Sequence, residues 1–158
     1  MPRGKNAVKR TIAPDENYNS VIISKFINTV MKRGKKTKAQ QIVYGALEQI
    51  KEKTKEEPLK IFDKVMNAVK PQVEVRSVRV GGANYQVPMP VSSDRQNALA
   101  FRWILGAARA RKGHSMEEKL MGEMTDILAG IGGALKKRED VHRMAEANKA
   151  FAHFARRA

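Results

Sequence analysis

Apolar side chains recur along most of the chain with the three- and four-residue spacing of amphipathic helices. Ser20 precedes the first apolar stripe, and we expect this helix to end near Gly34. A second stripe runs through residues 39–50. Pro58 suits the first position of a third helix, which Pro71 ends. The first half of the chain therefore predicts three helices.

Three further helices are predicted in the second half. Ser93 and Ser115 each begin a capping-box pattern, which places helix starts at these positions. The fourth helix is expected to run to about Arg111. A sixth helix is expected from about Ala134 towards Phe151, after a glycine-rich break.

The spacing changes to that of strands between residues 73 and 90. Residues 73–80 are rich in valine, residues 81–84 have turn chemistry, and residues 85–90 alternate. The valines change faces near Arg76 and Ser77, which indicates a bulge or a strong twist. The predicted fold is mostly α: a single domain, residues 1–158, of about six helices with a projecting two-stranded β-ribbon between helices three and four.

Charge adds a functional constraint. The 158 residues include 31 Lys and Arg against 16 Asp and Glu, a net charge of +15. Such an excess opposes compaction, so a polyanionic partner is a better explanation than a merely basic, solvated surface. The chain has no cysteine, which excludes disulfides and fits a reducing compartment. No signal peptide is visible, and no stretch approaches the ~20 apolar residues of a membrane span, so no membrane association is expected.

The basic residues form separate clusters that are candidates for RNA binding. Residues 1–16 read as an extended basic arm that orders on phosphate, or as a tail without a role, and residues 150–158 as a basic C-terminal tail. Three arginines seven residues apart fall within ~40° of one another on the fourth helix. The candidate RNA-binding residues are Arg3, Lys5, Lys9, Arg10, Lys32, Arg33, Lys35, Lys36, Lys38, Arg76, Arg79, Arg95, Arg102, Arg109, Lys136, Lys137 and Arg143.

Some side chains keep two interpretations. Trp103 lies off the apolar stripe of its helix and either packs under another segment, which we favour, or stacks on a base. Met144, Phe151 and Phe154 are core residues by default and otherwise part of a partner surface.

Enzymatic and metal chemistry is not supported. Gly34-Lys35 resembles part of a phosphate-binding loop, but Thr29 and Lys36 stand where that motif needs glycine and Ser or Thr. His142 and Glu146 are one turn apart without a second histidine at ligand spacing. We therefore expect no enzyme, no metal and no cofactor. A DNA-binding protein is the remaining rival, but the sequence shows no clear helix-turn-helix.

Four runs of residues resemble the bacterial small-subunit ribosomal protein seven (uS7) family. They are Gly34-Lys35-Lys36 with Ile42-Val43 and Ala46, residues 79–88 (RVGGANYQVP), residues 98–103 (ALAFRW) and residues 136–151 (KKREDVHRMAEANKAF). The resemblance spans nearly the whole chain in order. It departs at Ser92-Ser93, where the family often has Arg-Pro, and at Gln96, where a second arginine is common, which thins the positive patch at the start of the fourth helix.

The resemblance implies a structural component of the small ribosomal subunit, cytoplasmic and within the ribosome. It implies primary binding to the 3′ major domain of 16S rRNA, nucleation of head assembly, and a place at the subunit interface near the decoding centre and exit-site tRNA. Small-subunit proteins nine and eleven are the implied neighbours, and no homo-oligomer is expected. The residues implied to lie near tRNA or mRNA are Gly81, Gly82, Ala83, Asn84, Tyr85 and Arg143.

Overall fold

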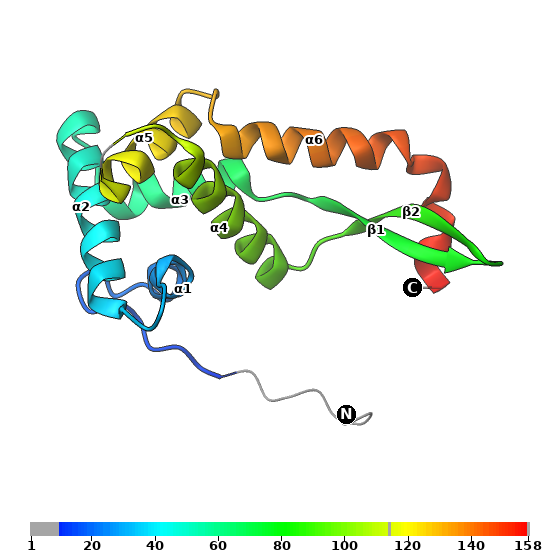
Figure 1. The fold of residues 1–158 in the computed structure, drawn as a ribbon, viewed down its shortest axis with the longest axis horizontal. Helices are drawn as coiled ribbons and strands as arrows, with labels where there is room; N and C mark the ends of the chain where they lie inside the picture. The colour runs from blue at the N-terminus through cyan, green and yellow to red at the C-terminus, as the bar shows by residue number, and fades with distance from the viewer. Residues whose placement is uncertain (1–9, 114, 158) are drawn as a thin grey trace.

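The computed structural model describes residues 10–113 and 115–157. In this part of the chain a helical body carries a two-stranded ribbon, as predicted (Figure 1). In order, the elements are α1 (Val21–Val30), α2 (Lys36–Thr54), α3 (Pro58–Val69), β1 (Val73–Val80), β2 (Ala83–Pro90), α4 (Ser93–Ala110), α5 (Met116–Leu128), α6 (Gly133–Ala147) and the 3-10 helix η1 (Lys149–Arg157).

Three phenylalanines form the centre of the body. The ring of Phe26 on α1 lies 5.3 Å from that of Phe62 on α3 and 5.3 Å from that of Phe101 on α4, centre to centre. All three rings are buried, at separations typical of attractive aromatic pairs. This cluster fixes α1 against α4.

The ribbon pairs in antiparallel register from Val73 opposite Pro90 to Val80 opposite Ala83. Gly81 and Gly82 form a two-residue turn with φ of 59° and 89°, which glycine adopts without a Cβ clash. The register is uninterrupted, so the bulge was wrong and the twist remains; Figure 1 shows the strands twisting about each other.

The valines on both faces are half-buried because different elements cover the two faces. Near the base, α6 packs beside Val73, whereas Tyr85, paired with Val78 in the register, packs on η1. In Figure 1, α6 runs alongside the ribbon and η1 crosses its outer half. The ribbon is therefore a braced arm and not an isolated hairpin.

Several helix ends differ from the prediction. α1 ends at Val30 and not near Gly34, because the backbone already leaves the helical region at Met31, whose ψ is 134°; Arg33 and Gly34 then adopt left-handed conformations in the connection. α2 already begins at Lys36, ahead of the predicted apolar stripe, so Lys36 and Lys38 lie in its first turn. α6 ends at Ala147 and the chain continues as η1.

Of the two predicted capping boxes, the one at Ser115 is confirmed in its serine half. The hydroxyl of Ser115 accepts a hydrogen bond from the backbone N–H of Glu118 at 3.1 Å. The other was wrong: Ser93 is already helical, and Ser92 occupies the cap position without a side-chain hydrogen bond. The start of α4 therefore has fewer local constraints than its sequence suggests.

The chain enters the body through Asp15, which is 6% exposed. Its carboxylate accepts hydrogen bonds from the Tyr44 hydroxyl at 2.7 Å and from the backbone N–H groups of Asn17 and Tyr18 at 3.3 Å. Burial, and next the hydrogen bond to Asp15, raise the pKa of Tyr44 to about 12. The basic arm predicted for residues 1–16 is thus anchored at its inner end.

The C-terminal tail predicted for residues 150–158 is folded where it is described. Residues up to Arg157 form η1, which packs against β2. Phe151 and Phe154 lie 5.3 and 5.2 Å from the ring of Tyr85, so they belong to a small aromatic cluster outside the main core. Met144 is 49% exposed, against the default expectation of a core position. Within the described residues no helix combines the length and apolar character needed to cross a bilayer.

Candidate nucleic-acid interface

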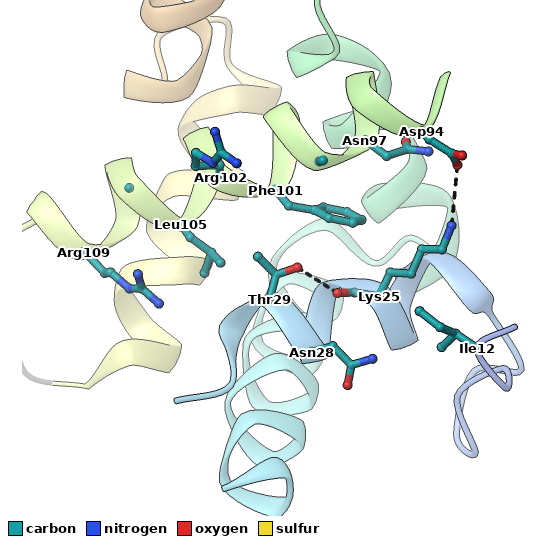
Figure 2. Close-up of a pocket in the computed structure, with 12 residues that line it drawn as sticks. Ile12, Lys25, Asn28, Thr29, Asp94, Asn97, Phe101, Arg102, Leu105 and Arg109 are labelled. Atoms are coloured by element: carbon teal, nitrogen blue, oxygen red, sulfur yellow. Dashed lines mark hydrogen bonds and ion pairs between the residues drawn. The ribbon is translucent and has the colours of Figure 1, made fainter. Parts of the chain in front are cut away.

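A groove separates α1 from α4 (Figure 2). Its volume is about 600 Å³, and it is lined by apolar and polar side chains from both helices and by Ile12. Phe101 and Leu105 project from α4 towards α1, whereas Arg109 reaches in from one end and Lys25 bounds the other. We call this space the α1–α4 groove.

A second groove adjoins it at Arg109, which lines both. This groove, of about 330 Å³, lies beside the connection between α1 and α2, and we call it the connection groove. Lys32, Lys35 and Lys38 contribute three more cations to its lining, and no acidic residue lines it. Arg109 therefore joins two surfaces into one positively charged face.

The structure exposes the side chains that the sequence proposed for RNA binding. Arg10 and all the candidates from Lys32 onwards are exposed, whereas Arg3, Lys5 and Lys9 lie outside the described residues. Within the described residues, an ion pair joins Arg143 to Asp140 at 3.5 Å, and Glu74 engages both Arg76 and Arg95. The candidates with no carboxylate partner in that part of the chain are Arg10, Lys32, Arg33, Lys35, Lys36, Lys38, Arg79, Arg102, Arg109, Lys136 and Lys137.

Glu74 at the base of the ribbon is the main exception to this unpaired positive surface. It is 8% exposed, and it accepts hydrogen bonds from Arg76 Nε at 2.8 Å and Arg95 Nε at 3.2 Å. Burial alone would raise the pKa of Glu74, but the two arginines outweigh it and hold that pKa below its usual range. Arg76 and Arg95 thus share one buried negative charge, and the three side chains carry a net charge of +1.

The N-terminal turns of α2 and α6 are unusual for isolated helices. Neither has an acidic residue in its first turn, and neither N-cap residue forms a side-chain cap. Instead Lys36 and Lys38 begin α2, and Lys136 and Lys137 follow the start of α6. Cations at a helix N-terminus oppose the helix dipole, whereas an anion there is stabilised by the free N–H groups. The first turn of α2 therefore favours an anionic partner, whereas the start of α6 already has the carboxylate of Glu123 on the N–H of Ala134.

A buried polar network orients α6. Glu123 of α5 is 2% exposed, and its Oε1 accepts a hydrogen bond from the backbone N–H of Ala134 at 2.9 Å. Its Oε2 accepts from Arg111 at 3.0 Å, and Arg111 also donates to Asp126 at 2.6 Å. These hydrogen bonds raise the pKa of Arg111. Glu123 thus supplies the cap that Gly132, the N-cap residue, has no side chain to give.

The outer ribbon exposes small residues. Gly81, Gly82, Ala83 and Asn84 are exposed, and Tyr85 is half-buried against the aromatic side chains of η1. Arg143 is exposed on α6, which lies alongside the ribbon. The structure therefore places these residues on the elongated arm and away from the two grooves (Figure 1).

Two side chains with alternative interpretations have structural roles. Trp103 is half-buried and packs against the main core, which confirms the favoured interpretation. His142 Nε2 accepts a hydrogen bond from the backbone N–H of Gln72 at 3.2 Å, which ties α6 to the base of the ribbon. Within the residues that the structure describes, no group of three or more His, Asp or Glu side chains could hold a metal ion.

Comparison with known proteins agrees with this basic, helical architecture. The family model described as "Ribosomal protein S7p/S5e" matches residues 2–149. The protein "Small ribosomal subunit protein uS7" of Treponema denticola is 56% identical over 98% of this chain and 99% of its own length. That of Kosmotoga olearia is 57% identical over 96% and 98%, and that of Nitrosospira multiformis 54% over 98% and 99%. The chain belongs to the uS7 family.

Membership of the uS7 family makes the protein a component of the small ribosomal subunit and not an enzyme. Its cytoplasmic location, within the ribosome, follows from that membership, and RNA binding and a role in translation agree with it. The resemblance read from the sequence is therefore confirmed over nearly the full chain.

Sequence reasoning missed several side chains that shape this uS7 surface. Lys25 lines the α1–α4 groove and lies 3.8 Å from Asp94, and its only signal is a polar residue beside the apolar stripe of α1. Arg138 donates to the carbonyl of Ala68 and so holds α6 to α3. Glu123 gave a clearer signal, because it lies on the apolar stripe of α5 beside Met124.

Proposed function

We propose that residues 1–158 form a single RNA-binding domain that binds the 3′ major domain of 16S rRNA directly and nucleates assembly of the subunit head. The observation that supports this most is the pair of adjoining grooves that share Arg109 and carry Lys32, Lys35 and Lys38. Membership of the uS7 family is the basis for assigning the protein to the small subunit. The residue runs that resemble the bacterial family are the basis for proposing the 3′ major domain as its binding site.

The electrostatic argument is one of unpaired charge. Exposed lysines that lie close together repel one another. Lys32, Lys35 and Lys38 line the connection groove, and no acidic residue in that lining offsets their charge. RNA phosphates relieve this repulsion and release condensed counterions, which gives binding a steep salt dependence. The bare N-terminal turn of α2 adds backbone N–H groups to the same surface.

The first experiment measures affinity for an rRNA head fragment as a function of salt. Substituting Lys35→Gln together with Lys38→Gln should weaken binding and reduce the slope of log affinity against log salt by roughly 1.5, about 0.7–0.9 per lost contact. The matched control is Lys51→Gln with Lys55→Gln, which removes the same charge from exposed positions on the far part of α2. Equal slopes for the two pairs, or equal affinity of the unsubstituted protein for random duplex DNA, would contradict the proposal.

The N-terminal arm is proposed to add affinity and not stability. Deleting residues 1–12 leaves the Asp15 anchor and the buried core intact, so the melting temperature should be nearly unchanged. The deletion removes four basic side chains, Arg10 among them, and also Ile12 from the groove wall. Binding to the rRNA fragment should weaken substantially, and unchanged binding would show that the arm has no role.

The ribbon tip and Arg143 are proposed to approach exit-site tRNA and the message, at the subunit interface near the decoding centre. Support comes from the exposed small residues at the tip and from the bracing that holds the arm in one orientation. Replacing residues 79–84 with Asn-Gly keeps Val78 opposite Tyr85 across a two-residue turn. Such subunits should still bind rRNA but retain exit-site tRNA less well. Full tRNA retention would refute this part.

Small-subunit proteins nine and eleven are the proposed protein neighbours, and the isolated protein is proposed to be monomeric. These expectations rest on the family resemblance. Sedimentation of the isolated protein, and cross-linking within reconstituted subunits, test them separately.

A further inference from the structure

Gly106 lies in the interior of α4 and lines the α1–α4 groove. It is exposed, its φ is not in the left-handed region, and a Cβ built on it meets no atom within 4 Å outside its own helix backbone. Glycine in a helix interior is destabilising relative to alanine. Neither the backbone conformation nor the packing requires glycine at position 106. The consequence of having glycine there is that no side chain projects into the groove from this position of α4.

The groove combines an apolar floor with a cationic rim. Phe101 is 3% and Leu105 2% exposed, and both project towards α1 in Figure 2. Lys25, Arg102 and Arg109 stand around them, and the one carboxylate in the lining, Asp94, lies 3.8 Å from Lys25, so Arg102 and Arg109 are the cations left for phosphate. An apolar slot beside guanidinium groups matches a nucleotide, whose base has apolar faces and whose phosphate carries the charge.

One polar group in the lining has no partner. The Oδ1 atom of Asn97 is buried and accepts no hydrogen bond within the part of the chain that the structure describes. A buried acceptor without a partner is costly and calls for an explanation. The edge of a base carries N–H donors, so a base beside Asn97 supplies the missing donor once the side chain turns its Oδ1 towards the groove.

From these observations we infer that the α1–α4 groove receives one unstacked nucleotide of the rRNA. The base enters over Phe101 and Leu105 beside Gly106, and the flanking phosphates bind Arg102 and Arg109. The volume of about 600 Å³ is within the ~300–1,000 Å³ of small-ligand sites. The inference rests on the proposed rRNA binding and adds a single-stranded, base-occupied site to it.

An intact RNA duplex would use this surface differently. Its phosphates would contact the cations on the rim and leave the floor between Phe101 and Leu105 empty. Sequence-specific RNA recognition usually takes bases from loops and bulges, where they can leave the stack. The open groove wall at Gly106 and the cations on the rim favour recognition of an unstacked base over binding of a duplex.

The substitution Gly106→Leu tests the inference, because it fills the groove and leaves every cation in place. Leucine is a better helix former than glycine and meets free space, so thermal melts should show an equal or higher melting temperature. Affinity for the rRNA head fragment should fall about tenfold or more, the scale of one lost base stack, while the salt slope stays unchanged. Ala110→Leu, an exposed position of α4 outside the groove lining, is the matched control and should bind normally.

A second measurement locates the nucleotide. The chain has no cysteine, so Ala98→Cys in the groove lining and Ala110→Cys outside it each carry one photo-cross-linker. Ala98→Cys should cross-link to the base of one unpaired nucleotide, mapped by primer extension. If the unsubstituted protein fails to bind the fragment, the proposed function falls and this inference with it. If that protein binds but Gly106→Leu binds equally well, or Ala98→Cys cross-links only within duplex RNA, this inference alone is wrong.

Discussion

Replacing Glu123 should destabilise the protein more than any exposed charge, because this carboxylate serves α4, α5 and α6 together. It is 2% exposed, caps the N–H of Ala134 and pairs with Arg111. Glu123→Ala leaves the N–H without its acceptor, at about 1–3 kcal/mol, and removes one of the two carboxylates on Arg111. The second loss adds about 1 kcal/mol or less, since Arg111 keeps Asp126 and is 32% exposed. The expected sum is about 1–4 kcal/mol.

Two more conservative substitutions separate these contributions. Glu123→Gln keeps an oxygen that can accept from Ala134 but loses the charge and the hydrogen bond from Arg111, because its amide NH2 group only donates, so it should cost about 1–2 kcal/mol. Asp126→Asn removes only the outer ion pair and should cost about 1 kcal/mol or less. Glu52→Ala, on an exposed carboxylate of α2, is the control and should change stability by less than about 0.5 kcal/mol.

Urea unfolding gives the free energies, and thermal melts give an independent scale. For a chain of this size 1 kcal/mol corresponds to about 2–4 °C, so Glu123→Ala should lower the melting temperature by roughly 2–16 °C. A Glu123→Ala protein within about 0.5 kcal/mol of the unsubstituted one would refute the reasoning. So would equal losses for Glu123→Ala and Asp126→Asn, since the buried cap would then contribute nothing.

Three further substitutions test other parts of the fold. Burial, and next the charge of Arg138, lower the pKa of His142 below its ordinary 6.5, so its stabilising contribution is complete above pH 6.5 and is lost as pH falls towards the folded-state pKa. Unfolding measured from pH 7 to 5 should therefore depend less on pH in His142→Gln. Tyr44→Phe leaves the buried Asp15 with one donor fewer and should cost about 1–2 kcal/mol by urea unfolding, and the tyrosine that ionises near pH 12 should vanish from an ultraviolet titration. Gly132→Ala places a Cβ 2.6 Å from Ile127 Cγ1 and should lower stability by about 1–3 kcal/mol in thermal melts.

Local pattern was enough to predict the elements of this fold. The apolar stripes located the helices, and Gly81-Gly82 located the two-residue turn of the ribbon, because these signals depend on neighbouring residues only. Helix ends were less predictable. Gly34 is left-handed as expected after a helix, but α1 ends four residues earlier, where Val30 completes its contact with the core.

The exposed cations were also visible in the sequence, since runs of lysine are rarely buried. The tertiary arrangement that brings these cations together could not be predicted from the sequence. Arg109 connects two grooves only because α4 crosses α1, and Arg95 meets Glu74 only because the ribbon returns to the start of α4. The contact of Phe154 with Tyr85 joins positions 69 residues apart, which no local spacing encodes.

The aromatic contact between β2 and η1 also imposes an order on synthesis. The chain leaves the ribosome from its N-terminus, so both strands of the ribbon emerge before α6 and well before Phe151 and Phe154. A lone hairpin is marginally stable in water, so the nascent ribbon has no fixed direction until η1 has been translated and has closed over Tyr85. The grooves between α1, α2 and α4 need none of those later residues in their lining. The residues that line the two grooves are therefore translated before those that orient the arm.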